Sequence, residues 1–221
     1  TSGGTDSGVM KLVADACQKH QVAVPLIGFA PYARIHGREH IERTSSAAES
    51  RRDGSRHVQY HPSQLPPNDA DGARLNPNHT HFVLVEGEAT GQAAWGAEIG
   101  LRTSFEQYFT QHLHVPMVLL VVAGGPGTVS TALQSARKRS PIVIIGDSGG
   151  AATALLKFAR AGVVSEARFE QHVSAFQEIM RLNEDAGGRL GSFFPLSDAT
   201  SGDEDRLSRA LLLPIIHNLA R

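Results

Sequence analysis

The sequence has few of the residues that would tie it to a disulfide scaffold, a nucleic acid or a membrane. Its single cysteine, Cys17, excludes a disulfide within the chain, which suits the reducing cytoplasm where we expect it. Its 21 basic and 22 acidic residues leave a net charge of −1, which argues against a nucleic-acid partner or contact with an anionic membrane surface. No apolar run reaches the roughly 18 residues of a membrane-spanning helix, and no signal peptide is present. We therefore expect a soluble protein in which any affinity for anions is local.

Glycine is abundant instead, and it gathers in turns that open a helix-like pattern, the second and third of them after an apolar segment. Three such turns occur, at residues 3–8, 124–128 and 146–150. At the junction of a strand and a helix, backbone N–H groups point outward and the helix dipole favours negative charge, so a phosphate can approach where side chains are missing. One glycine turn is weak support, because glycine also ends strands; three of them favour a ligand-binding crevice.

The hydrophobic pattern between these turns predicts alternating strands and helices. Strands are expected at 22–29, 79–85, 118–122 and 141–145, and helices at 8–18, 97–111, 128–138 and 151–161. Because the strands are apolar throughout and helices separate them, we predict a Rossmann-like, doubly wound α/β fold whose mostly parallel sheet has helices on both faces. Helices predicted at 166–182 and 203–219, with a turn-rich stretch at 187–202 between them, form a helical C-terminal cap.

A single domain is expected over residues 1–221, with a core at 1–161 and a helical part at 162–221. No strand precedes the first glycine turn, which predicts that an upstream strand belongs to a longer protein. The segment 44–78 is rich in Ser, Pro, Asn, Asp and Arg and has no sustained period. It is interpreted as an insertion, either a lid over the site or a disposable surface loop. Ligands of such sheets lie beyond the carboxyl ends of the strands, and all three glycine turns fall on that edge.

Six separated motifs resemble, in order, those of the SLOG superfamily and its LSDAT branch. They are GGTDSGVMK at 3–11, IGFAPY at 27–32, NHTHFVLVE at 78–86, WGAEIGLR at 95–102, AGGPGT at 123–128 and GDSGG at 146–150. That branch includes the N-terminal nucleotide-binding domain of melastatin-type TRP channels and prokaryotic relatives fused to TIR or Sir2 effectors in antiphage defence. The resemblance implies a sensor of an NAD-derived nucleotide, ADP-ribose or cyclic ADP-ribose, without a further cofactor. It also implies a homo-oligomer that regulates a fused or partner effector.

The ligand contacts that the resemblance implies come from the three glycine turns and from two side chains. The turn residues are Gly3, Gly4, Thr5, Ser7 and Gly8 for phosphate or ribose, Gly124, Gly125, Gly127 and Thr128 for phosphate, and Asp147, Ser148 and Gly149. Trp95 stands where ADP-ribose-binding channels have an aromatic residue beside the base, and Arg102 where they have an arginine beside the phosphates. Gly150 stands where those channels have a further arginine, which favours a less anionic or a cyclic ligand.

The same superfamily contains enzymes, the Lonely-Guy-type phosphoribohydrolases, whose signature resembles PGGxGTxxE. The glutamate of that signature acts on the glycosidic bond. In this chain Ala123 and Thr131 stand at the proline and glutamate positions, and a threonine cannot supply carboxylate chemistry. We therefore expect a binding domain without catalytic activity, with a nucleotide hydrolase and a structural multimerisation domain as the alternatives.

Three further side-chain patterns allow more than one interpretation. His79 and His81 share one face of a predicted strand, but a metal site needs further ligands, so no metal is predicted and a hydrogen-bonding role is favoured. Ser148 matches the GxSxG nucleophile elbow loosely, without an acid and a histidine in that motif's chain order. Glu98 either hydrogen-bonds a ribose or pairs with Arg102 at i, i+4, and the ion pair is favoured.

Overall fold

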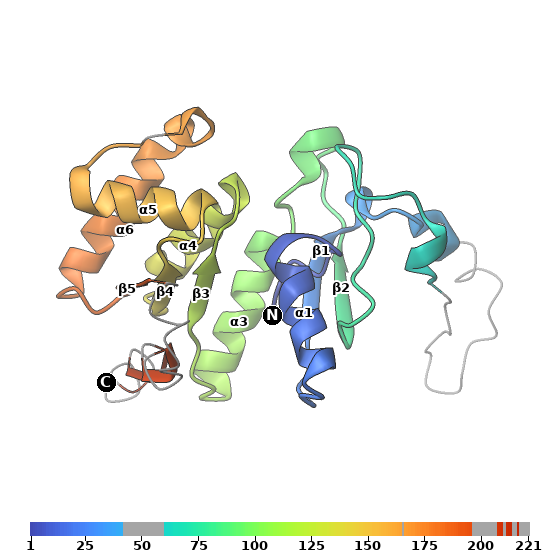
Figure 1. Cartoon of the computed structure of the whole chain (residues 1–221), viewed down its shortest axis with the longest axis horizontal. Helices are drawn as coiled ribbons and strands as arrows, with labels where there is room; N and C mark the ends of the chain where they lie inside the picture. Colours follow the sequence, from blue (N-terminus) through green and yellow to red (C-terminus); the bar gives the residue numbers. More distant parts are fainter. Residues whose placement is uncertain (42–59, 165, 196–206, 210, 214–215, 217–221) are drawn as a thin grey trace. The chain divides into compact units, whose positions relative to one another are not determined.

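The strands and helices of the chain fall into two units, residues 1–98 and 99–221, and each unit is described by itself (Figure 1). The computed structural model describes residues 1–41, 60–164, 166–195, 207–209, 211–213 and 216. Each unit has its own parallel sheet with helices around it, so the predicted Rossmann-like α/β class is confirmed. The predicted extent of one domain over the whole chain stays a prediction.

Two parallel strands form the sheet of the first unit. Strand β1 (Ile27–Pro31) lies beside β2 (His81–Val85), with Phe29 opposite Val83. A short bridge at Ser2 continues the sheet, because the Ser2 N–H donates to the backbone of β1 at 3.0 Å and its carbonyl accepts a β1 N–H at 2.8 Å. The residues that lead into the first glycine turn therefore run alongside β1.

The strand predicted at 22–29 begins five residues later than expected. Pro25 has no N–H to give to a strand ladder. The side chains of Val22 and Val24 are nearly half exposed, at 48% and 45%, so the start of this apolar run gains little from burial. Helix α1 (Gly8–Lys19), by contrast, matches its predicted range within one residue.

Short 3₁₀ helices follow the two strands of the first unit, η1 (Tyr32–Arg34) after β1 and η3 (Gly91–Ala94) after β2. Because the two strands are parallel, the segments that contain η1 and η3 both leave the sheet at the carboxyl ends of its strands. Ligands of open α/β sheets bind beyond those ends. These two segments are therefore the part of the first unit where a ligand contact is expected.

Part of the predicted insertion at 44–78 is built into the first unit. It contains the 3₁₀ helix η2 (Pro62–Gln64), and Ala73 and Leu75 form bridges to other segments. Both of these side chains are 4% exposed. The interpretation as a disposable surface loop is therefore wrong for residues 60–78, because these residues supply backbone pairing and core surface. Residues 44–59 lie outside the described residues, and the lid interpretation of the segment 44–78 stays a prediction.

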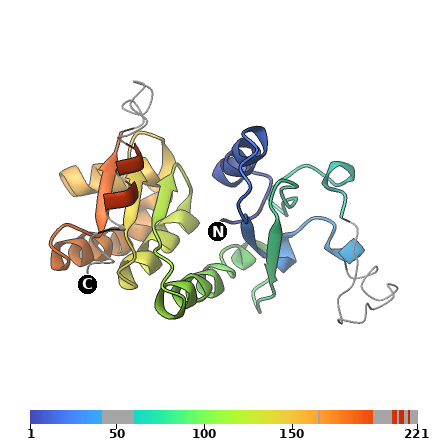
Figure 2. The same cartoon turned by 90° about the horizontal axis from the view of Figure 1, so that it is seen from below.

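Three parallel strands form the sheet of the second unit, in the order β3-β4-β5 (Figure 2). They are β3 (Leu119–Val122), β4 (Ile142–Ile145) and β5 (Gly191–Phe194). All four residues of β4 are buried, as expected for a strand with a neighbour on each side and helices over its faces. Leu119 lies opposite Ile142, which sets the carboxyl ends of β3 and β4 side by side.

Helices surround this sheet in the described part of the second unit. They are α3 (Ile99–His112), α4 (Pro126–Arg137), α5 (Gly150–Ala161), η4 (Ala167–His172) and α6 (Val173–Asp185). Ala132 and Ala136 of α4 are fully buried, so the small side chains let α6 pack closely on α4. Phe176 of α6 stacks on Phe158 of α5 with ring centroids 5.4 Å apart. Within the described part of the chain, no helix is both long and apolar enough to cross a bilayer.

Strand β5 corrects the prediction of a helical C-terminal part at 162–221 without a strand. The stretch 187–202 was predicted as turns, yet Gly191–Phe194 pairs with β4 and extends the sheet. A four-residue strand between glycine- and serine-rich neighbours has too few positions for a strand period to show. The helix predicted at 166–182 divides into η4 and α6, and the helix predicted at 203–219 lies largely outside the described residues.

Candidate functional site

The turn between β3 and α4 is the best-formed candidate for an anion site in the second unit. The chain takes left-handed backbone angles at Ala123 (φ +47°) and Gly124 (φ +90°), then enters α4 with Pro126 in its first turn. Proline suits that position because the first N–H groups of a helix have no partner within it. The N–H of Thr128 donates to the Gly125 carbonyl at 3.0 Å, which tightens the first turn of α4.

The three glycines of this turn have different roles. A Cβ atom on Gly124 would lie 2.3 Å from Thr128 Oγ1, and its φ is left-handed, so the fold itself requires this glycine. A Cβ atom on Gly125 or Gly127 would meet nothing within 4 Å. Gly125 has φ −111° and ψ −162°, an extended conformation open to any residue. Gly125 and Gly127 therefore leave open surface at the N-terminus of α4, where a phosphate needs a close approach.

Backbone hydrogen bonds join the residues that follow the third glycine turn to the second turn. The N–H of Ala151, in the first turn of α5, donates to the Gly124 carbonyl at 2.9 Å, and the N–H of Ala152 donates to the Ala123 carbonyl at 3.0 Å. A Cβ atom on Gly150 would lie 2.2 Å from the Gly124 oxygen, and Gly150 has φ +51°. This close packing of two backbones explains why no side chain stands at residue 150.

The hydroxyl group of Ser148 also connects the third glycine turn to the second. Its Oγ donates to the Ile145 carbonyl at 2.6 Å and accepts the N–H of Ala123 at 2.7 Å. A nucleophilic serine needs a base that accepts its proton. Here the proton is committed to a backbone carbonyl, so the geometry favours a structural role for the hydroxyl and disfavours the nucleophile interpretation.

Arg102 lies beside the start of α4. Its Nη2 donates to Thr131 Oγ1 at 2.8 Å, and the Thr131 hydroxyl donates in turn to the Gly127 carbonyl at 3.1 Å. The Arg102 side chain is 12% exposed, and its Nε lies 3.9 Å from Glu106 Oε1, one helical turn further along α3. The structure thus brings Arg102, Thr131 and Gly127 together. Glu106 was not singled out from the sequence, although its i, i+4 spacing from Arg102 was a usable signal.

The first glycine turn is packed at Gly4, whereas a Cβ atom on Gly8 would meet nothing within 4 Å. A Cβ atom on Gly4 would lie 2.8 Å from the Cα of Gly28, and one on Gly28 would lie 2.5 Å from the Cα of Gly4. Two backbones therefore touch here, and Gly4 also has φ +68°. Thr5 is 4% exposed, with its hydroxyl 3.0 Å from that of Ser7, which directly precedes α1.

A chain of polar side chains holds this first turn in place. His79 is 8% exposed; its Nε2 lies 2.7 Å from Ser2 Oγ and its Nδ1 lies 3.2 Å from Asn76 Oδ1. The Asn76 amide nitrogen then donates to Asp6 Oδ1 at 2.9 Å. Burial lowers the pKa of His79 below its ordinary value, so the neutral ring is favoured. In that form Nδ1–H donates to Asn76 and Nε2 accepts from Ser2.

This network bears on the metal interpretation of the two histidines. Both ring nitrogens of His79 have partners within the fold, and His81 Nδ1 lies 2.8 Å from Thr80 Oγ1. In the described ranges, no three His, Cys, Asp or Glu residues gather as a metal site would require. Asn76 and Asp6 were missed from the sequence because 70 positions separate them and only the fold brings them together.

Trp95 directly follows η3, and 38% of it is exposed. The guanidinium carbon of Arg34 lies 5.2 Å from the centroid of its ring. That distance is within the range of a cation–π contact. Arg34 is 5% exposed and ends η1. No sequence pattern singled out Arg34.

Comparison with known proteins gives the family of this chain. The family model described as SLOG in TRPM matches residues 1–185. The chain belongs to this family. The resemblance inferred from the six motifs is confirmed.

Curated relatives of this SLOG domain are TRPM channel proteins. The transient receptor potential cation channel subfamily M member-like 2 of Nematostella vectensis is 34% identical over 168 residues, which cover 69% of this chain and 10% of that protein. Subfamily M member 2 of Rattus norvegicus is 28% identical over 198 residues (81% and 12%), and member 7 of Homo sapiens is 30% identical over 170 residues (71% and 8%). The chain therefore spans about a tenth of the length of these relatives.

The predicted site residues of this SLOG domain are distributed over both units. The first unit holds Gly3, Gly4, Thr5, Ser7, Gly8 and Trp95; the second holds Arg102, Gly124, Gly125, Gly127, Thr128, Asp147, Ser148 and Gly149. Within the second unit the structure brings Arg102 and the start of α4 together. The single crevice and the ligand contacts stay predictions.

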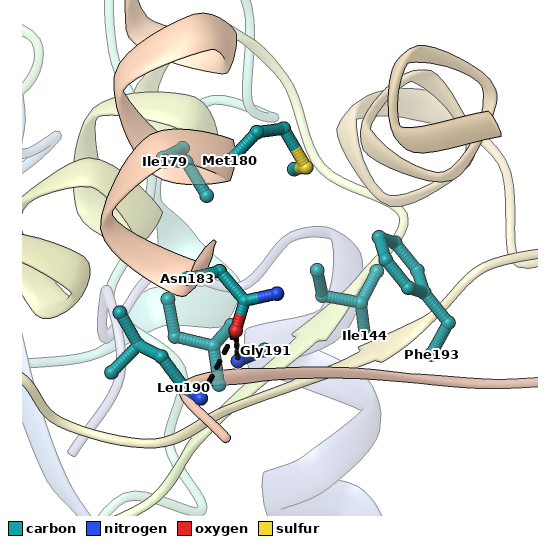
Figure 3. Close-up of a pocket in the computed structure, with 8 residues that line it drawn as sticks. Ile144, Ile179, Met180, Asn183, Leu190, Gly191 and Phe193 are labelled. Atoms are coloured by element: carbon teal, nitrogen blue, oxygen red, sulfur yellow. Dashed lines mark hydrogen bonds between the residues drawn. The ribbon is translucent and has the colours of Figure 1, made fainter. Parts of the chain in front are cut away.

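A small cavity of the second unit is lined by none of these residues (Figure 3). It encloses about 10 Å³ and is lined mainly by apolar side chains of α6, β4 and β5, among them Ile144, Ile179 and Phe193. Asn183 Oδ1 accepts the N–H groups of Leu190 and Gly191 at 3.0 and 2.8 Å, as the dashed lines show. So small an apolar space is a packing gap of the core.

Proposed function

We propose that this SLOG domain binds an NAD-derived nucleotide, ADP-ribose or cyclic ADP-ribose, and that the second unit holds a phosphate group at the start of α4. The observation that carries this proposal is the open surface at Gly125 and Gly127, beside the guanidinium of Arg102. Backbone N–H groups and the positive end of the helix dipole favour an anion there. The matched relatives are channel proteins.

Arg102 supports the proposal through its position and its spare donors. A guanidinium has five N–H groups, and the contact with Thr131 uses one of them. The side chain is largely shielded from water, so its charge acts more strongly on a nearby anion than an exposed arginine does. Thr131 occupies the hydrolase glutamate position and is hydrogen-bonded to Arg102, which leaves no carboxylate there for glycosidic cleavage. Binding without hydrolysis is the function that this arrangement favours.

The domain acts, in this proposal, as a sensor within a larger oligomeric protein. The channel relatives favour a channel as the attached effector over a TIR or Sir2 enzyme, and they favour a cytoplasmic location for the domain. Nucleotide binding shifts the effector only when the two states of the protein have different affinities for it.

Calorimetric titration of the chain with ADP-ribose and cyclic ADP-ribose tests the proposal, with the variant Gly125→Val as the key comparison. The valine side chain would occupy the space at the start of α4, so measurable binding is expected to disappear while the circular dichroism spectrum stays native. Gly100→Val is the matched control, because a Cβ atom at Gly100 also meets nothing within 4 Å and this glycine lies in α3. Unchanged affinity in Gly125→Val would show that the turn only ends a strand.

A further inference from the structure

Arg34 is a buried cation at the carboxyl end of β1. It is 5% exposed, and its backbone carbonyl accepts the N–H of Ala73 at 2.9 Å, which fixes the end of η1 against the segment 60–78. No role in the fold predicted from sequence requires an arginine here. A buried arginine needs a physical account, because a charge loses the stabilisation of water when it is buried.

The contacts of the Arg34 guanidinium leave part of it unused. Its Nη2 donates to the carbonyl of Ala70, which also accepts the side-chain amide of Gln92. Its guanidinium carbon lies over the ring of Trp95. Its Nε, however, is buried and has no hydrogen-bond partner among the residues that the structure describes.

Arg34 also has no acidic partner in the described part of the first unit. None of the ion pairs formed by described residues includes it. Burial of an ion is costly unless an opposite charge and hydrogen bonds compensate it. The carbonyl of Ala70 and the ring of Trp95 compensate the buried charge only in part. The Nε–H group of Arg34 is still available as a hydrogen-bond donor.

We propose that Arg34, held against Trp95, is an anion site of the first unit that takes a phosphate or diphosphate group. The planar guanidinium matches the geometry of phosphate oxygens, and its contact with Trp95 holds it in place. The site follows the carboxyl ends of β1 and β2, where ligands of parallel sheets bind. It is inferred from residues of the first unit alone and does not depend on the phosphate site proposed at α4.

Trp95 is the only tryptophan of the chain, so its fluorescence reports on this site directly. The experiment titrates the full chain with inorganic pyrophosphate at constant ionic strength, with sodium chloride as the reference salt. We expect a saturable change in Trp95 emission with pyrophosphate and none with chloride. Titrations with ADP-ribose and adenosine identify the source of the diphosphate. ADP-ribose should bind more tightly than pyrophosphate only if the site takes the diphosphate of a nucleotide, and adenosine, which has no diphosphate, is the reference.

Two variants and one control test the role of Arg34. Arg34→Gln should weaken pyrophosphate binding about 10- to 150-fold, the range expected for a charge-assisted hydrogen bond. Arg34→Lys keeps the buried charge but loses the planar fork, so it should fold and bind with intermediate affinity. Arg38→Gln is the matched control, because Arg38 is an exposed arginine four residues further on and should bind like the unmodified chain.

The outcomes test the anion site at Arg34 separately from the proposed function. No saturable emission change with pyrophosphate, or an affinity that Arg34→Gln and Arg34→Lys leave unaltered, would overturn the anion site even if ADP-ribose binds. A pyrophosphate response that requires Arg34 supports the site even where ADP-ribose fails to bind, and that failure would count against the proposed function alone. If Arg34→Gln does not fold, the comparison of Arg34→Lys with Arg38→Gln decides.

Discussion

The glycine turns at residues 3–8 and 124–128 look alike in sequence but do different work. In the first turn, Gly4 packs against the backbone of Gly28, and neighbouring side chains are joined in a buried network. In the second turn only Gly124 is packed, while Gly125 and Gly127 face open space. Gly4 is therefore needed for close backbone packing, whereas Gly125 and Gly127 leave space that a ligand could use. Substitutions that separate packing from binding can break or sharpen this contrast.

The largest expected effect is on stability, in Gly4→Val. Its Cβ atom would lie 2.8 Å from a backbone atom of Gly28, and the residue must also keep φ +68°. Overpacking costs about 1–3 kcal/mol and a left-handed L-residue about 1–2 kcal/mol, so we expect a loss of roughly 2–5 kcal/mol in the free energy of unfolding. Urea denaturation followed by circular dichroism measures it. Gly125→Val should change this free energy by no more than about 0.5 kcal/mol; equal losses in both variants would remove the contrast.

A smaller effect, on affinity, is expected for Arg102→Ala in the second unit. Removal of its charge-assisted contact should weaken ADP-ribose binding about 10- to 150-fold and leave adenosine binding unchanged, because adenosine has no diphosphate. Arg137→Ala is the control: Arg137 ends α4, pairs with Glu178 at 2.8 Å and should leave both affinities unaltered. Calorimetry measures the two ligands. Equal losses for ADP-ribose and adenosine would make Arg102 a structural residue of the α3–α4 contact.

How much the sequence predicts differs between the two units for a physical reason. In the second unit, β3, α4 and α5 have bounds within two residues of those predicted, because continuous apolar runs meet Gly or Pro at their ends. Strand β5 was not predicted because it is short and surrounded by turn residues. In the first unit, Asn76 and Arg34 have partners distant in sequence, so local patterns carry no sign of their contacts. Bounds of strands and helices that depend on local residue patterns could therefore be predicted, whereas contacts between residues distant in sequence could not.

Trp95 should show the opposite ligand dependence to Arg102. Trp95→Ala removes a stacking surface worth about 1–3 kcal/mol, so adenosine binding should weaken as well as ADP-ribose binding, and the adenosine loss should be nearly independent of salt. Trp95→Phe keeps an aromatic face and should recover part of the affinity. Titrations at low and high sodium chloride measure the salt dependence. A loss confined to ADP-ribose would mean that Trp95 acts only by holding Arg34, without any contact to a base.

The smallest expected effect is a pH dependence of stability that originates in the network around the first turn. Burial lowers the pKa of His79, so at mildly acidic pH the unfolded chain binds a proton there more readily than the folded chain does. The stability that the neutral ring contributes is therefore present above the unfolded pKa of about 6.5 and is lost as the pH falls below it. Urea midpoints at pH 7.5 and 5.5 measure the change. His79→Gln should reduce the pH dependence, whereas His20→Gln, at an exposed position after α1, should not. If both variants keep the full pH dependence, the proton is bound elsewhere and the buried ring is not what couples the first turn to pH.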